Sequence, residues 1–346
     1  MSIPWKPDSR YFCHDDEMRN PDTLFTLSEL REAAHSVHAI MPATPQYAWP
    51  RLAEATGCRV WVKHENHTPT GAFKVRGGII YMETLRRTGQ PIKGVVTATR
   101  GNHGQSVAFS AARNGIPATI FVPRGNAADQ NSAMRAFGAT VIEHGRDFDE
   151  AREECARLAA QQDLHFIPPF HRDLVKGVST YALELFEAVP SLDAVYVPIG
   201  MGSGIVGLIT ARDLLGLKTE IIGVVARNAP AMALSFQAGH PVPTATARTF
   251  ADGVATRQPN EKAVAIIHRG AARMVQVSED EIAAGVRTYF QTTHQVVEGA
   301  GATPLAALLQ EREPMRGKSV ALVMTGSNID AGVYERILSG QTPAVG

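Results

Sequence analysis

The sequence has no excess of charge of either sign, few cysteines and no long apolar run. Lys and Arg together number 34, as do Asp and Glu, so the net charge is zero, which argues against a general attraction to nucleic acid or membrane. Cys13, Cys58 and Cys155 form no CxxC pair, which excludes a disulfide framework and fits a reducing cytoplasm. No run approaches ~18 apolar residues, and the N-terminal MSIPWKPDSRYF has no apolar signal-peptide core. We therefore expect a cytoplasmic protein without membrane helices.

Strand-like and helix-like segments alternate along most of the chain. Apolar residues make up 44% of the 346 positions and charged residues 20%, which is typical of soluble globular proteins with one large or two ordinary domains. Such alternation predicts an α/β fold with parallel sheets and helices on both faces. Strands are expected at 93–99, 117–123, 140–145, 192–200, 219–225, 272–278 and 319–326, and helices at 101–115, 131–139, 147–161, 202–216, 279–291 and 303–311.

Three glycine-containing turns follow predicted strands, where binding sites of such folds occur. They read TRGNHGQS at 99–106, PIGMGSGIVG at 198–207 and MTGSNID at 324–330. In the second, Gly200, Gly202, Ser203 and Gly204 could present backbone N–H groups to a phosphate at a helix N-terminus. The same glycines could equally serve a tight strand–helix turn. The turn is not a dinucleotide fingerprint, because G-x-G-x-x-G would need a glycine at Val206.

One lysine occupies an unusual place, within TGAFKVRGG at 70–78. Lys74 lies between Phe73 and Val75, among small residues and glycines rather than on a polar face. It is either an ordinary surface lysine beside a loop or a buried amine next to a cofactor, and this stretch alone leaves both interpretations open.

Taken in order, these motifs resemble those of one family. The motifs are FK in a glycine-containing segment, GNHGQ, the Gly/Ser turn and TGSN, together with TFADGVAT at 249–256 and VVEGAGA at 296–302. As a set they resemble the motifs of fold-type II pyridoxal phosphate enzymes. The closest similarity is to serine/threonine dehydratases (threonine ammonia-lyases) and serine racemases. The resemblance runs from Thr44 to Asp330. It implies a tryptophan synthase β-like fold of two domains, each with a mostly parallel sheet flanked by helices.

The resemblance also assigns roles to individual residues. Lys74 would bind pyridoxal 5'-phosphate as a Schiff base, helped by a pKa that burial lowers. Thr325 would face the pyridine nitrogen, and since a hydroxyl cannot keep that nitrogen protonated as a carboxylate can, prompt β-elimination is favoured. The other implied cofactor contacts are Phe73 on the ring, Asn102 on the phenolic oxygen, and Gly200, Met201, Gly202, Ser203 and Gly204 on the phosphate.

The implied reaction is dehydration and deamination of a β-hydroxy amino acid such as threonine or serine to a 2-oxo acid and ammonia. Lys74 would remove the α-proton, and the substrate carboxylate would lie on the turn of Thr99, Arg100, Gly101, Asn102 and His103 at a helix N-terminus. Three alternatives remain open: β-replacement or threonine-synthase-like chemistry, a dehydratase specific for a hydroxyaspartate or phenylserine, and a non-catalytic binding protein.

Two departures from the family pattern refine this expectation. Serine racemases carry a serine just before GNH, whereas this chain has Arg100; arginine is a poor base, which argues against racemisation. Arg100 either holds a carboxylate or is a surface arginine paired elsewhere. Metal-activated relatives have a Glu and an Asp where this chain has Val225 and Ala231, so we expect no metal, because hard cations need oxygen ligands.

The expected domain organisation follows from the same resemblance. Residues 1–90 and 171–346 would form a large cofactor-binding domain, and residues 91–170 an inserted small domain whose closure excludes water. We expect no C-terminal regulatory domain and a homodimer or homotetramer that acts on a small molecule.

Overall fold

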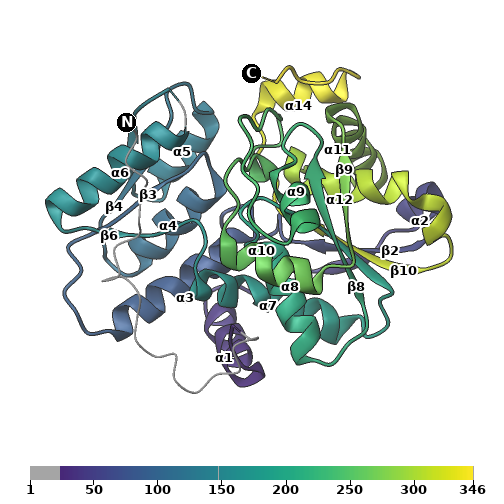
Figure 1. Cartoon of the computed structure of the whole chain (residues 1–346), viewed down its shortest axis with the longest axis horizontal. Helices are drawn as coiled ribbons and strands as arrows, with labels where there is room; N and C mark the ends of the chain where they lie inside the picture. Colours follow the sequence, from purple (N-terminus) through teal and green to yellow (C-terminus); the bar gives the residue numbers. More distant parts are fainter. Residues whose placement is uncertain (1–23, 147, 346) are drawn as a thin grey trace.

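Two open sheets, each covered by helices, make up the structure, a computed structural model that describes residues 24–146 and 148–345. In Figure 1 the smaller sheet and its helices lie on the left and the larger sheet on the right, with α3 and α7 passing beneath them. Within the described residues, no helix is both long and apolar enough to cross a membrane. Cys13 lies outside these residues.

The larger sheet has six strands in the order β1-β2-β10-β7-β8-β9. Its neighbouring strands pair in parallel except for the edge strand β1, which is antiparallel to β2. The strands are β1 (Gln46–Ala48), β2 (Arg59–His64), β7 (Ala194–Pro198), β8 (Glu220–Ala226), β9 (Arg273–Val277) and β10 (Ser319–Met324).

The smaller sheet has four parallel strands in the order β5-β4-β3-β6. They are β3 (Val95–Ala98), β4 (Ala118–Val122), β5 (Thr140–Glu143) and β6 (His165–Phe166). All four come from one continuous part of the chain, whereas the larger sheet combines strands from before and after it. The exact domain boundaries at 90 and 171 remain a prediction.

Helices connect the strands and cover the sheets. The helices that precede β7 in the chain are α1 (Leu27–His38), α2 (Pro50–Thr56), α3 (Lys74–Arg87), α4 (Asn102–Arg113), α5 (Ala128–Ala136), α6 (Phe148–Gln162) and α7 (Arg172–Ala188). The helices that follow β7 are α8 (Ser203–Leu214), α9 (Ala231–Ala238), the short 3-10 helix η2 (Asp252–Val254), α10 (Glu261–Gly270), α11 (Glu279–Thr293), α12 (Gly299–Gln310), α13 (Arg312–Met315) and α14 (Ala331–Leu338).

The larger sheet is buried on both faces, and its strands show why. Along β7, Val195 and Val197 join the core formed with α7 and α8, whereas Ala194 and Tyr196 join the core formed with α11 and α12. Alternate residues of a strand point to opposite faces, so a continuous apolar run such as AVYVP fits a sheet sandwiched between helices. The predicted α/β class with mostly parallel sheets flanked by helices is therefore confirmed.

Some elements differ from the sequence-based expectation. The predicted helix at 303–311 begins earlier, at Gly299, and contains Pro304 in its interior. Helix α7, most of whose residues are buried, was not among the predicted helices. Residues 240–260, between α9 and α10, contain η2 and otherwise no regular element.

Candidate active site

The predicted site segments converge where strands of the larger sheet end. The segment before α3 pairs with the segment after β10 through the bridge between Ala72 and Gly326 and the hydrogen bond from Phe73 N–H to the Thr325 carbonyl, 3.0 Å. Two stretches about 250 positions apart in the chain are thereby joined. Because β2 and β10 are parallel neighbours, their carboxyl ends lie at the same edge of the sheet.

Lys74 is the first residue of α3 and lies among buried neighbours. Its Nζ donates a hydrogen bond of 2.9 Å to Oγ of Ser203 and lies 4.8 Å from the centre of the Phe73 ring. Burial lowers the pKa of Lys74 to about 8, although the carboxylate of Glu298 opposes this shift. At neutral pH a larger fraction of the Lys74 amine is therefore unprotonated than for an exposed lysine. Only the unprotonated amine can act as a nucleophile or a base. Of the two interpretations of Lys74, the buried amine is the one that this geometry supports.

The turn from Gly200 to Gly204 joins β7 to α8 and faces Lys74. Gly202 has φ of +98°, a left-handed conformation that favours glycine, and α8 begins directly after it, at Ser203. A Cβ atom at Gly200 would lie 2.2 Å from the Gly253 carbonyl oxygen, so only glycine allows η2 to pack on this turn. The turn thus combines a helix N-terminus with close backbone packing, which is the arrangement that binds phosphate groups.

Asn102, the first residue of α4, is fixed by partners on both sides of its amide. Its Nδ2 donates to both carboxylate oxygens of Glu298, at 2.9 and 3.0 Å. Its Oδ1 accepts from Nδ2 of Asn328 at 2.8 Å, and the same Asn328 nitrogen donates to the Thr70 carbonyl. The amide of Asn102 is therefore held in one orientation by Glu298 and Asn328, and Asn328 is in turn bonded to Thr70.

Glu298 is a site residue that sequence reasoning did not single out. It is 8% exposed, and burial raises its pKa to about 7, with Asn102 acting in the opposite direction and Asp252 in the same direction. A carboxyl group with a pKa near neutrality in a cleft is typical of functional sites. The available signal was a single acidic residue within the otherwise uncharged VVEGAGA.

Thr325 follows β10 and is 2% exposed. Its Oγ1 has no hydrogen-bond partner within the described part of the chain. Buried hydroxyl groups almost always have a partner, so this atom is suited to a polar atom of a bound molecule. A pyridine nitrogen, which accepts one hydrogen bond, would complete it.

The turn expected to hold the substrate carboxylate lies between β3 and α4. Oγ1 of the buried Thr99 accepts from Gly101 N–H at 3.1 Å. His103 is buried with its Nε2 unpartnered among the described residues, and burial together with the charge of Lys74 lowers its pKa to about 3. The imidazole is therefore neutral at physiological pH and can accept a hydrogen bond from a ligand.

Arg100 lies at the mouth of this region rather than inside it. Its side chain is 46% exposed, and its Nη1 is 3.6 Å from Oδ1 of Asp252, whose side chain is 60% exposed. Asp252 belongs to η2, which packs against the phosphate turn, so this ion pair links the segment after β3 with the larger sheet. Arg100 thus has an acidic partner, and about half of its side chain is exposed.

Beneath α3, a buried network of charges holds the helix that begins with Lys74. Arg76 donates to Glu65 at 2.7 Å and to Glu184 at 2.6 Å, and Lys63 donates to Glu184 at 2.5 Å. Burial opposes ionisation of Glu184, but the charge of Arg76 prevails and lowers its pKa to about 2. All four side chains are at most 7% exposed. The network therefore ties α3 to β2 and α7.

Comparisons with known proteins agree with this geometry. Residues 40–326 match the family model described as pyridoxal-phosphate dependent enzyme. The chain is 34% identical to an L-threonine ammonia-lyase of Thermotoga maritima over 317 residues, which cover 91% of this chain and 79% of that protein. It is 32% identical to an L-threo-3-hydroxyaspartate ammonia-lyase of Saccharomyces cerevisiae, covering 91% and 97% of the two chains.

A solved structure shows the same fold. The processed form of threonine deaminase isoform 2 from Solanum lycopersicum superposes with a TM-score of 0.83 at 29% identity, covering 92% of this chain and 95% of that one. The expected fold-type II architecture is confirmed by this match together with the family match.

Proposed function

Since the chain belongs to the family of pyridoxal-phosphate dependent enzymes, we propose that it is an ammonia-lyase that dehydrates and deaminates a β-hydroxy amino acid. The named relatives support this reaction type. The observation that supports this reaction for the present chain is the position of the Lys74 amine. It lies 2.9 Å from Oγ of Ser203 at the start of α8, and burial lowers its pKa to about 8.

The residues present fit pyridoxal 5'-phosphate. Lys74 would be its covalent anchor, and the turn from Gly200 to Gly204 would hold its phosphate at the N-terminus of α8. The unpartnered Thr325 hydroxyl supports a contact with the ring nitrogen, and Asn102 is oriented toward the same region by Glu298. When bound, the cofactor supplies an electron-withdrawing ring that stabilises negative charge at the α-carbon of the substrate.

The chain's own groups would carry the proton transfers and the binding. The Lys74 amine would take the α-proton, for which a pKa near the working pH is suitable. The turn from Thr99 to His103 would bind the substrate carboxylate with backbone N–H groups at the start of α4. Glu298 would act as a positioning residue that fixes the amide of Asn102.

Two substrate classes fit the site. Threonine or serine needs no further charged contact, and the pairing of Arg100 with Asp252 leaves the cation satisfied without the substrate. A hydroxyaspartate is the second candidate, because Arg100 is half exposed and could exchange Asp252 for a substrate carboxylate. We place threonine or serine first, since their use requires no ion pair to be broken.

The compartment and assembly are part of the proposal. We propose a cytoplasmic enzyme, which is supported by the unpaired buried thiols of Cys58 and Cys155. We also propose a homodimer or homotetramer. The exposed side chain of Tyr47 on the outer strand β1 supports this, because an uncovered edge strand is a natural contact surface. Light scattering after size-exclusion chromatography measures the assembly.

One experiment tests the reaction and the anchor together. The cofactor-loaded enzyme should release a 2-oxo acid from threonine or serine, and borohydride should fix the cofactor on Lys74. Lys74→Ala should lose both the label and the activity. Peptide mapping that finds the label on another lysine, such as the buried Lys63, would show that the anchor is wrong. Absence of 2-oxo acid from all β-hydroxy amino acids, with the label on Lys74, would leave the anchor and overturn the reaction.

A further inference from the structure

Helix α5 contacts the segment after β10 through the side chain of Gln130. Its Nε2 donates a hydrogen bond of 2.8 Å to the Asn328 carbonyl, and its Oε1 accepts one of 2.8 Å from Nε2 of Gln105 on α4. Helices α4 and α5 connect strands of the smaller sheet, whereas Asn328 follows β10 of the larger sheet. Gln130 therefore links the parts of the chain that carry the two sheets, and because both ends of its amide are bonded, the amide is held in one orientation.

Asn328 is the residue at which this link meets the candidate active site. Gln130 holds its backbone carbonyl, while its side-chain Nδ2 donates to Oδ1 of Asn102 at 2.8 Å and to the Thr70 carbonyl at 2.8 Å. Asn102 in turn donates to Glu298 at 2.9 Å. The contacts thus run without a gap from Gln130 through Asn328 to the amide of Asn102 and to the segment that precedes α3.

Gln130 also packs directly on the turn between β3 and α4. A Cβ atom at Gly101 would lie 2.5 Å from Oε1 of Gln130 and 2.8 Å from its Cδ, so a side chain at this position would displace the Gln130 amide. A second amide, that of Asn126 shortly before α5, donates to the Arg100 carbonyl at 2.9 Å. The turn proposed to bind the substrate carboxylate is therefore held from one side by Gln130 and Asn126.

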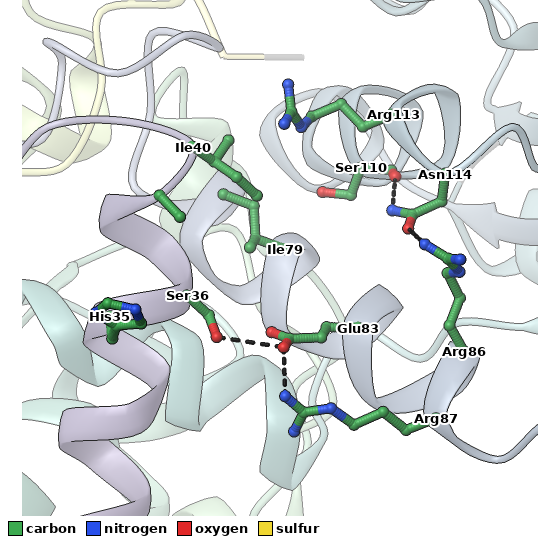
Figure 2. A pocket seen from close by; sticks show the side chains of 11 residues that line it. His35, Ser36, Ile40, Ile79, Glu83, Arg86, Arg87, Ser110, Arg113 and Asn114 are labelled. Carbon is green, nitrogen blue, oxygen red and sulfur yellow. Dashed lines mark hydrogen bonds and ion pairs between the residues drawn. The ribbon is translucent and has the colours of Figure 1, made fainter.

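A comparable amide joins two helices far from the site. In Figure 2, Asn114 at the end of α4 lies between two partners, because its Oδ1 accepts from Arg86 of α3 at 3.0 Å and its Nδ2 donates to the Ser110 carbonyl at 2.7 Å. Asn114 and Gln130 are both half-buried. The side-chain bonds of Asn114 reach neither the segment after β10 nor the turn before α4, so this residue provides a matched comparison for an amide that only holds helices together.

We propose that Gln130 is a positioning residue, an inference that rests on the proposed function. Gln130 fixes the Asn328 backbone and the turn at Gly101 relative to each other. Through Asn328 it sets the place of the Asn102 amide toward the bound cofactor. Loss of its two hydrogen bonds should therefore weaken binding of the substrate carboxylate and change the surroundings of the cofactor, although Gln130 itself holds neither of them.

Gln130→Met tests the proposal, because methionine keeps the length of the side chain but forms neither hydrogen bond. The cofactor-loaded enzyme is titrated with alanine, an amino acid without a β-hydroxyl group, and binding is measured from the absorbance of the cofactor. The dissociation constant of alanine should rise about three- to tenfold, the effect expected for the loss of one hydrogen bond. The control Asn114→Leu removes the other helix-joining amide at similar size and should bind alanine as the unmodified enzyme does.

The absorbance of the cofactor gives a second measurement that needs no substrate. By the family resemblance, Asn102 would donate to the phenolic oxygen of the cofactor, and a donor there favours the deprotonated oxygen. Gln130→Met should therefore raise the pH at which this absorbance changes, and Gln130→Ala should give both effects without the bulk of methionine. Either measurement unchanged in both Gln130 variants, or equal effects in Asn114→Leu, would overturn the proposal. Both effects in an enzyme that releases no 2-oxo acid would retain the positioning role and overturn the proposed reaction instead.

Discussion

Burial of Glu298 favours the protonated form of its carboxyl group, although the hydrogen bonds from Asn102 oppose this. Its pKa of about 7 lies above the ordinary value of 4.5, so between these two pH values the folded chain binds more protons than the unfolded chain. Stability that depends on this group is present below about pH 4.5 and is lost as the pH rises toward 7. The size of the loss is on the order of 3 kcal/mol.

We therefore predict that Glu298→Gln changes how stability depends on pH. In the cofactor-free protein, the variant should lose less stability than the unmodified protein between pH 5 and pH 8, since a neutral amide has no proton to release. Urea unfolding midpoints at both pH values measure this. The exposed Glu54→Gln is the control and should leave the pH dependence as it is. Parallel curves for Glu298→Gln and the unmodified protein would contradict the assigned titration.

Arg100 is the residue through which the two proposed substrate classes can be distinguished by experiment. If it binds a substrate side-chain carboxylate, Arg100→Ser should lower kcat/KM for a hydroxyaspartate by roughly 30- to 150-fold, which corresponds to about 2–3 kcal/mol. The value for threonine should change far less. Steady-state kinetics with both substrates measures the ratio. An equal loss for both would leave Arg100 with the structural role of pairing with Asp252.

Chiral analysis of a long incubation with serine should find no opposite enantiomer, because arginine is a poor base.

At the scale of elements, helix α3 depends on charges that it buries. Arg76 has no exposed surface and is shared by Glu65 and Glu184. Removing one partner of a buried ion pair leaves uncompensated charges, which costs about 3–5 kcal/mol. An exposed pair such as Arg31 and Glu187, 4.0 Å apart, contributes at most about 1 kcal/mol.

Arg76→Met should accordingly destabilise the protein by about 3–5 kcal/mol, whereas the control Arg31→Met should change stability little. Denaturant unfolding compares the two variants. Because α3 begins with Lys74, Arg76→Met should also weaken cofactor binding, measured as the cofactor concentration that gives half-maximal absorbance. If both variants lose the same stability, the buried network does not hold α3 in place.

At the scale of the whole molecule, two apolar residues of β8 and α9 lead to a prediction about metal ions. Val225 on β8 and Ala231 at the start of α9 are both fully buried apolar residues. By the resemblance described in the sequence analysis, they would stand where metal-activated relatives have carboxylates. Treatment with EDTA should therefore leave the activity unchanged. A clear loss that Mg²⁺ or Ca²⁺ restores would show that a cation site exists elsewhere in the chain.

The order of motifs determined the family and the α/β class, and it predicted the site segments, because each motif encodes local chemistry. A lysine among small residues, a glycine turn before a helix, and a polar turn after a strand are features of neighbouring residues. Their backbone requirements are also local, as the positive φ of Gly202 illustrates. Such features can be recognised along the chain before it folds.

Tertiary structure alone decided how the site is supported and tuned. Glu298 contacts Asn102 across 196 positions, and Arg76 contacts Glu184 across 108. The pKa values of Lys74 and Glu298 depend on burial by residues that are distant in sequence. The unpartnered hydroxyl of Thr325 is likewise visible only after folding. Burial and long-range pairing are properties of three-dimensional packing, and no pattern of neighbouring residues specifies them.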